Sequence, residues 1–166
     1  MAIEIERKFL VAGDAWRGEA RRSRRIVQGY LSGAGGQGVA CSVRVRTSGD
    51  SAWVTIKSAV PGVERREYEY PVPLADARAM LAEFCAQFIE KTRHDIVHEG
   101  LTFEVDEFGG ANAGLVIAEV ELDDVDRQFA RPSWLGQEVS DKPRYYNAHL
   151  LQYPFSAWSA GERAGD

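Results

Sequence analysis

This 166-residue chain has few cysteines, no excess of positive charge and no long apolar run. Its two cysteines, Cys41 and Cys85, lie far apart without metal-binding spacing, so we expect a reduced, cytoplasmic setting. Lysine and arginine number 20 against 25 aspartates and glutamates, which argues against a general nucleic-acid partner. No apolar run approaches the ~18 residues of a membrane helix, and the first residues enter a charged strand at once. We therefore expect no membrane partner and no signal peptide.

Apolar and polar residues alternate with a period of two along most of the chain, which predicts β-strands. Glycine-rich or polar turns separate several of them and favour antiparallel hairpins. Eight strands are predicted at residues 2–11, 24–32, 38–47, 51–59, 63–72, 88–98, 101–108 and 115–123. Helical segments are predicted within 13–22, 73–85 and 134–151. No linker interrupts the pattern, so we expect one domain at 1–155 and a mobile tail at 156–166.

Charges recur on one face of seven of these eight strands. In EIERKFLV, residues 4–11, the side chains of Glu4, Glu6 and Lys8 share a face, although like charges in register normally repel. The acids on such stripes are Glu4, Glu6, Glu67, Glu69, Glu104, Asp106, Glu119 and Glu121. The bases are Lys8, Arg44, Arg46, Lys57, Arg65, Lys91 and Arg93.

Two interpretations fit these stripes, because alternation alone does not say which face is inside. In the first, a β-sandwich or barrel turns its charged faces to water, as antiparallel sheets often do. In the second, an eight-stranded sheet closes into a tunnel with the charges inward and the apolar stripes covered by helices. Carboxylates would then hold a hard cation, and arginine and lysine would bind phosphate oxygens.

The ordered set of motifs resembles one known family. EIERKFLV resembles the ExExK signature of the CYTH superfamily, the triphosphate tunnel metalloenzymes. The resemblance continues in order and covers nearly the whole chain, most like the small stand-alone bacterial members. Its further motifs are QGYL (28–31), VRVR (43–46), TIKS (55–58), RREYEYPVP (65–73), KTR (91–93), FEVDEF (103–108), GLVIAEVEL (114–122) and EVSDKPRYYNAHL (138–150).

The resemblance implies a fold and an activity. The expected fold is α+β and mainly antiparallel β: an eight-stranded closed or cup-shaped β-tunnel with flanking helices. The expected activity is divalent-metal-dependent hydrolysis of a small polyanionic substrate, inorganic triphosphate, to pyrophosphate and phosphate. A class IV-type adenylate cyclase and a nucleoside or thiamine triphosphatase are alternatives, and a non-catalytic polyphosphate-binding protein is a further one. A homodimer is also compatible with the sequence.

The resemblance also implies roles for individual residues. The expected ligands of Mg²⁺ or Mn²⁺ are Glu4, Glu6, Glu119, Glu121 and Asp106, with Glu104 as a further ligand or a partner of one. The expected substrate contacts are Lys8, Tyr30, Arg44, Arg46, Lys57, Arg65 and Arg93. Lys91, with Arg93 beside it, is the expected catalytic group that activates water, because a neighbouring cation lowers the pKa of a lysine. A plain phosphate contact is the alternative role of Lys91.

Overall fold

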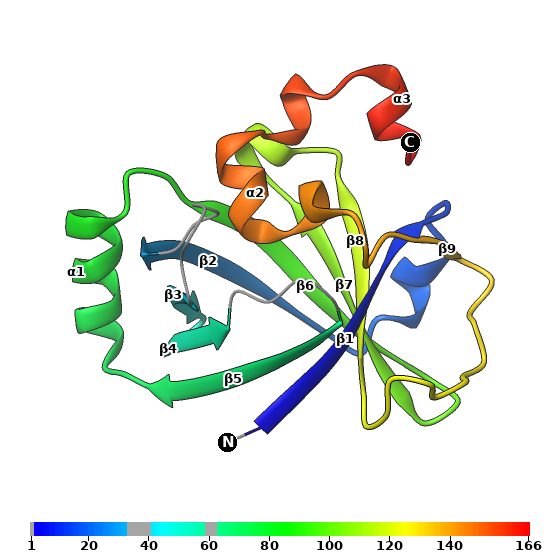
Figure 1. The fold of residues 1–166 in the computed structure, drawn as a ribbon, viewed down its shortest axis with the longest axis horizontal. Helices are drawn as coiled ribbons and strands as arrows, with labels where there is room; N and C mark the ends of the chain where they lie inside the picture. The colour runs from blue at the N-terminus through cyan, green and yellow to red at the C-terminus, as the bar shows by residue number, and fades with distance from the viewer. Residues whose placement is uncertain (1, 33–40, 59–62) are drawn as a thin grey trace.

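An antiparallel sheet that closes on itself forms the body of the molecule (Figure 1). The computed structural model describes residues 2–32, 41–58 and 63–166. Its strands follow the order β5-β4-β3-β2-β6-β7-β8-β1, and pairing of β1 with β5 closes the barrel, which confirms the predicted fold class. The strands are β1 (Ala2–Val11), β2 (Arg22–Ser32), β3 (Cys41–Ser48), β4 (Ser51–Ser58), β5 (Glu64–Pro71), β6 (Ile89–His98), β7 (Leu101–Phe108) and β8 (Val116–Leu122).

All eight predicted strands are present, with small shifts at their ends. Residues 38–40 and residue 59 of two predicted strands, and the glycine-rich turn at 33–38, lie outside the described residues. The structure adds a short strand that was not predicted, β9 (Leu135–Glu138), which pairs with β1 at Phe9 and Val11. Four residues of mixed polarity are too few for alternation to reveal a strand.

Two apolar clusters cover the outer face of the barrel. Helix α1 (Leu74–Phe84), predicted at 73–85, places Ala77 and Leu81 against Val45 and Ala52 of β3 and β4. The second cluster joins Phe9 to Trp16 of the 3₁₀ turn η1 (Ala15–Glu19) and to Trp134, Phe103, Val105 and Val120. None of the helices in the described parts of the chain is long and apolar enough to cross a membrane.

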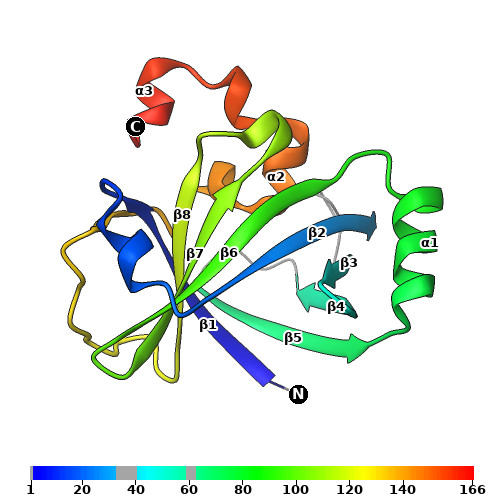
Figure 2. The same ribbon diagram turned by 180° about the vertical axis from the view of Figure 1, so that it is seen from behind.

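A third apolar cluster closes one end of the barrel from inside. Leu10 opposes Ile117 two residues beyond the Lys8–Glu119 pair, so all four side chains share the inner face. Ile117 belongs to a cluster with Ile89, Phe108, Leu150 and Trp158. Leu150 lies on α2 (Asn147–Gln152), the helix predicted within 134–151, which stands beside the ends of β6–β8 (Figures 1 and 2). The C-terminal segment thus plugs this end of the tunnel.

The last residues fold back onto this plug. Trp158 is buried and meets the ring of Tyr145 edge-on, with the ring centroids 5.1 Å apart. The short helix α3 (Ala160–Arg163) begins with a capping box in which Ser159 and Glu162 exchange hydrogen bonds. That residues 156–166 form a mobile tail stays a prediction, to be weighed against this packing.

Candidate active site

The register of the strands gathers the charged side chains inside the barrel, because directly opposed residues of antiparallel strands share a face. Glu119 of β8 opposes Lys8 on one side and Glu104 on the other. On the next pair of strands, Arg93 of β6 opposes Asp106 of β7. Among the side chains that the structure describes, the charged ones that are buried are Lys8, Lys91, Arg93, Asp106 and Glu119. Their burial excludes the sandwich with its charged faces in water.

Lys8 lies at the centre of the acidic part of the tunnel. Its Nζ donates to Glu6 Oε1 at 2.5 Å and also to Glu119 Oε1. Burial opposes the charge of Lys8, but Glu119 and Glu6 outweigh it and raise the pKa of the lysine above its usual range. Burial likewise opposes the charge of Glu119, but Lys8 and then Arg93 hold its pKa well below the usual range. Lys8 and Glu119 therefore stabilise each other's charged forms.

Arg93 and Lys91 share the carboxylate of Asp106. Arg93 donates to both oxygens of Asp106, at 2.7 and 2.6 Å, to Glu119 Oε2 at 2.6 Å, and to Glu104. Lys91 Nζ donates to Asp106 Oδ2 at 2.5 Å. The pKa of Lys91 is lowered, first by burial and also by the charge of Arg93, although Asp106 acts in the opposite direction. The pKa of Lys91 is thus shifted in the opposite direction from that of Lys8.

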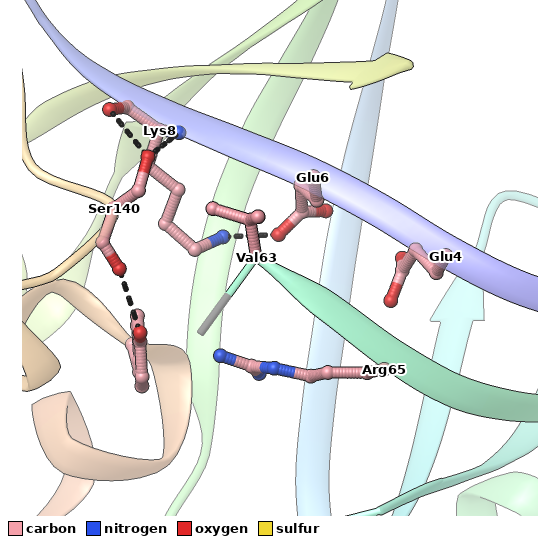
Figure 3. A pocket seen from close by; sticks show the side chains of 7 residues that line it. Glu4, Glu6, Lys8, Val63, Arg65 and Ser140 are labelled. Atoms are coloured by element: carbon pink, nitrogen blue, oxygen red, sulfur yellow. Dashed lines mark hydrogen bonds and ion pairs between the residues drawn. The ribbon is translucent and has the colours of Figure 1, made fainter. Parts of the chain in front are cut away.

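Glu4 belongs to a second ion-pair group nearer the open part of the tunnel. Lys57 Nζ lies 2.6 Å from Glu4 Oε2 and 2.8 Å from Glu67 Oε2. Burial and then the charge of Glu6 raise the pKa of Glu4 to about 7, against the opposing charge of Lys57. Glu4, Glu6, Lys8 and Arg65 line one pocket, into which their side chains converge (Figure 3).

Arg44 and Arg46 face this acidic wall from β3. Arg46 Nη2 donates to Glu69 Oε2 at 3.0 Å, and Arg44 Nη2 donates to Thr55 Oγ1 at 3.3 Å. The Nε–H of each arginine is buried and has no acceptor in the structure. Burial and then Arg44 lower the pKa of Arg46. Two crowded guanidinium groups with unsatisfied donors suit an anion that supplies several oxygens.

Three other predicted site residues lie at the edge of this arrangement. Tyr30 opposes Arg44 on the ladder, so it faces the tunnel from β2. Arg65 lies over the ring of Tyr146, with Cζ 4.6 Å from the centroid. Glu121 opposes Glu6 on the ladder and is exposed. The structure therefore places every predicted metal and substrate residue on the inner face, with Glu121 at its solvent side.

Sequence patterns did not reveal several residues that support the site. Ser140 Oγ accepts from the backbone N–H of Lys8 at 2.9 Å and donates to Glu138 at 2.8 Å. Tyr146 donates to the carbonyl of Ser140 at 2.7 Å. Arg24 continues the ionic network to Glu104 at 3.2 Å. The sequence could have revealed Arg24, because it shares the inward face of its strand with Gln28. Ser140 and Tyr146 lie outside regular strands and helices, where no periodic pattern marks them.

The acidic residues fit a divalent cation by the chemistry of their donors. Carboxylate oxygens are the ligands that Mg²⁺ and Mn²⁺ favour. Burial and the charge of Glu6 raise the pKa of Glu4 although Lys57 lies beside it, and a bound cation would favour the ionised carboxylate. Among residues 2–32, 41–58 and 63–166, no group of three or more acids, histidines or cysteines is already arranged around a metal position. Lys8 and Lys57 lie between the carboxylates instead.

Comparison with known proteins agrees with this geometry. The family model of the CYTH domain matches residues 2–148, and the chain belongs to this family, whose triphosphatases are typically metal-dependent. An inorganic triphosphatase of Acetivibrio thermocellus is 43% identical over 93% of this chain and 97% of its own. One of Nitrosomonas europaea is 33% identical over 89% of this chain and 95% of its own. A crystal structure of an inorganic triphosphatase superposes with a TM-score of 0.64 at 33% identity, covering 89% of this chain and 97% of that one.

Proposed function

We propose that this protein is an enzyme that hydrolyses inorganic triphosphate to pyrophosphate and orthophosphate with the help of Mg²⁺ or Mn²⁺. The observation that carries the proposal is the closed tunnel, in which the half-buried Glu6 and the buried Glu119 lie on one side and the half-buried Arg44 and Arg46 on the other. The relatives of similar length that carry the name inorganic triphosphatase support the same substrate.

The basic residues would bind the phosphate oxygens. Arg44 and Arg46 hold unsatisfied N–H donors inside the tunnel, and guanidinium groups bind phosphate through paired hydrogen bonds. Lys8 and Lys57, now shared between carboxylates, and Arg65 at the pocket wall add further positive charge. Arg93, held by three carboxylates, is fixed in position before the substrate arrives. Tyr30 lines the same wall from β2.

The acidic residues would hold the cation. Glu4, Glu6, Glu119 and Glu121 come from the adjacent strands β1 and β8, and Asp106 with Glu104 continues the acidic surface on β7. When bound, the cation would neutralise the phosphate oxygens and orient the terminal phosphoryl group for in-line attack by water.

Lys91 is the group best placed to accept a proton from the attacking water. Burial lowers its pKa and Arg93 acts in the same direction, whereas Asp106 opposes both. The negative charge of a bound triphosphate would raise the pKa of Lys91. A protonated Lys91 would instead contact a phosphate oxygen, which is its alternative role.

The alternatives differ in their products. Incubation with triphosphate, ATP and thiamine triphosphate, each with Mg²⁺, Mn²⁺ or EDTA, should give orthophosphate fastest from triphosphate and none in EDTA. Formation of cyclic AMP from ATP would favour the adenylate cyclase. Faster release of orthophosphate from a nucleoside or thiamine triphosphate would identify that compound as the preferred substrate. Binding without turnover would leave a polyphosphate-binding protein.

Two further expectations belong to this proposal. Both cysteines are free thiols, which supports a reduced cytoplasmic setting. A homodimer stays an expectation from the sequence. Light scattering at several protein concentrations tests the dimer.

A further inference from the structure

One buried polar side chain inside the tunnel has no partner. Gln28 of β2 is completely buried, and neither its Oε1 nor its Nε2 has a hydrogen-bond partner in the structure. An amide that is removed from water without replacement hydrogen bonds destabilises the folded state, and such groups are rare in native proteins. A functional ligand for this amide would explain why it is tolerated.

The register places Gln28 between the phosphate-binding and water-activating groups. It opposes Arg46 of β3 on one side and Ile89 of β6 on the other. Lys91 opposes Ile26, two residues earlier on the same face, so Gln28 and Lys91 are diagonal neighbours. Long side chains in diagonal positions on one face of a sheet are close enough to interact.

The chemistry of an amide differs from that of its neighbours. Arg46 can only donate hydrogen bonds, whereas the amide offers two N–H donors and an uncharged oxygen acceptor. A carboxylate in this position would accept a hydrogen bond from water but would repel the terminal phosphoryl group. An amide can accept from water and donate to a phosphate oxygen at the same time.

We propose that Gln28 is a positioning residue for the nucleophilic water of triphosphate hydrolysis. Its Oε1 accepts one O–H of the water, and its Nε2 donates to an oxygen of the terminal phosphoryl group. The water oxygen bonds to the terminal phosphorus while the bond from that phosphorus to the bridging oxygen breaks. Pyrophosphate leaves with the bridging oxygen, and the proton lost by the attacking water ends on the departing pyrophosphate. This inference rests on the proposed triphosphatase function.

The test uses Gln28→Met, which keeps the size of the side chain and removes both hydrogen-bonding atoms. We expect kcat on triphosphate with Mg²⁺ to fall about 100-fold, as misplacement of a nucleophile does, with KM within threefold. The midpoint of thermal unfolding should stay equal or rise, because an unsatisfied buried amide has been removed. Gln28→Asn keeps an amide on a shorter side chain and should have a kcat between those of Gln28→Met and the unmodified protein. Gln128→Met, in an exposed loop, is the control and should have the kcat and KM of the unmodified protein.

Each other outcome overturns the inference. An unchanged kcat removes Gln28 from the reaction, and a raised KM with kcat intact makes it a phosphate contact. A lower unfolding midpoint in both Gln28 variants, with kcat per folded protein retained, makes it a structural residue that holds buried water. If the unmodified protein itself releases no phosphate, the proposed function fails first and the inference fails with it.

Discussion

At the scale of single residues, the tunnel is stabilised by charges that compensate one another. Lys8 is held by Glu6 and Glu119, and Arg93 by Asp106, Glu104 and Glu119. A buried ion that loses its partner costs about 3–5 kcal/mol, so each of these groups depends on the others. Glu4 is the exception, because burial and the charge of Glu6 outweigh Lys57 and raise its pKa.

The raised pKa of Glu4 predicts a pH dependence of stability in the metal-free protein. The pKa is about 7 in the folded protein and near 4.5 in the unfolded chain, so between these values the folded state binds more protons. The free energy of unfolding attributable to Glu4 therefore falls as pH rises from about 4.5 to 7. The charged groups facing Glu4 include Glu6, Lys57 and Glu67, and Arg65 lies opposite it on β5.

Urea unfolding in EDTA at pH 5 and pH 7.5 measures this effect. The unmodified protein should lose on the order of 1–3 kcal/mol more than Glu4→Gln between the two pH values. Equal losses in both proteins would show that Glu4 is ionised throughout this range.

Replacing Lys91 by alanine tests its role in the reaction. If Lys91 accepts the proton of water, kcat should fall by about 100-fold or more with little change in KM. Arg25→Ala, an exposed position that pairs with Glu90 on the neighbouring strand, is the control and should leave both constants unchanged. A rise in KM with kcat nearly intact would assign Lys91 to phosphate binding.

At the scale of elements, close packing of α1 on the sheet depends on one glycine. A Cβ added at Gly29 of β2 would lie 2.5 Å from Cys85 Sγ and 2.8 Å from Cys85 Cβ. Gly18, with nothing within 4 Å of such a Cβ, is a matched control. The sheet therefore approaches the end of α1 only where a side chain is absent.

Gly29→Ala should lower the free energy of unfolding by about 1–3 kcal/mol through overpacking, and Gly18→Ala should change it by less than about 0.5 kcal/mol. Both are measured by urea unfolding. The double variant Gly29→Ala/Cys85→Ala should recover part of the loss, because the nearest atom is removed. A Gly29→Ala protein as stable as the original would show that α1 can move away at no cost.

The same scale shows what sequence patterns can and cannot predict. Alternation predicted the eight strands of the barrel, because one face of each strand is charged and the other apolar. It could not predict that Ile89, Phe108 and Ile117 face inward, since apolar residues were expected to face the helices outside. Their inward position depends on the C-terminal plug, a long-range contact. Ser140 and Gln28 carry no charge and so did not stand out from their neighbours.

At the scale of the whole molecule, the tunnel is closed at one end and charged in its middle. Phe108 joins the two parts, because it belongs to the plug cluster while Lys91 Nζ lies 5.4 Å from the centre of its ring. Packing of the C-terminal segment should therefore contribute to the stability of the barrel around the site.

Leu150→Ala tests this contribution. Leu150 is buried in the plug, so its truncation should cost about 2–5 kcal/mol in urea unfolding. Val125→Ala, at an exposed position, should be nearly neutral. Amide exchange should become faster first in residues 147–163, which separates local loosening of the plug from loss of the barrel. If Leu150→Ala leaves the free energy of unfolding unchanged, the C-terminal segment is not part of the stable core. The mobility expected for residues 156–166 would then extend to the plug.

The central claim is that the charged interior of the barrel is where triphosphate is hydrolysed. The most direct measurement is the initial rate of orthophosphate release from triphosphate with Mg²⁺, compared between Glu6→Gln and Glu107→Gln. The two variants make the same chemical change, one inside the tunnel beside Lys8 and the other at an outer ion pair with Arg17. We predict a loss of about 100-fold or more for Glu6→Gln and a change of less than about twofold for Glu107→Gln. Full activity of a folded Glu6→Gln protein would contradict the account.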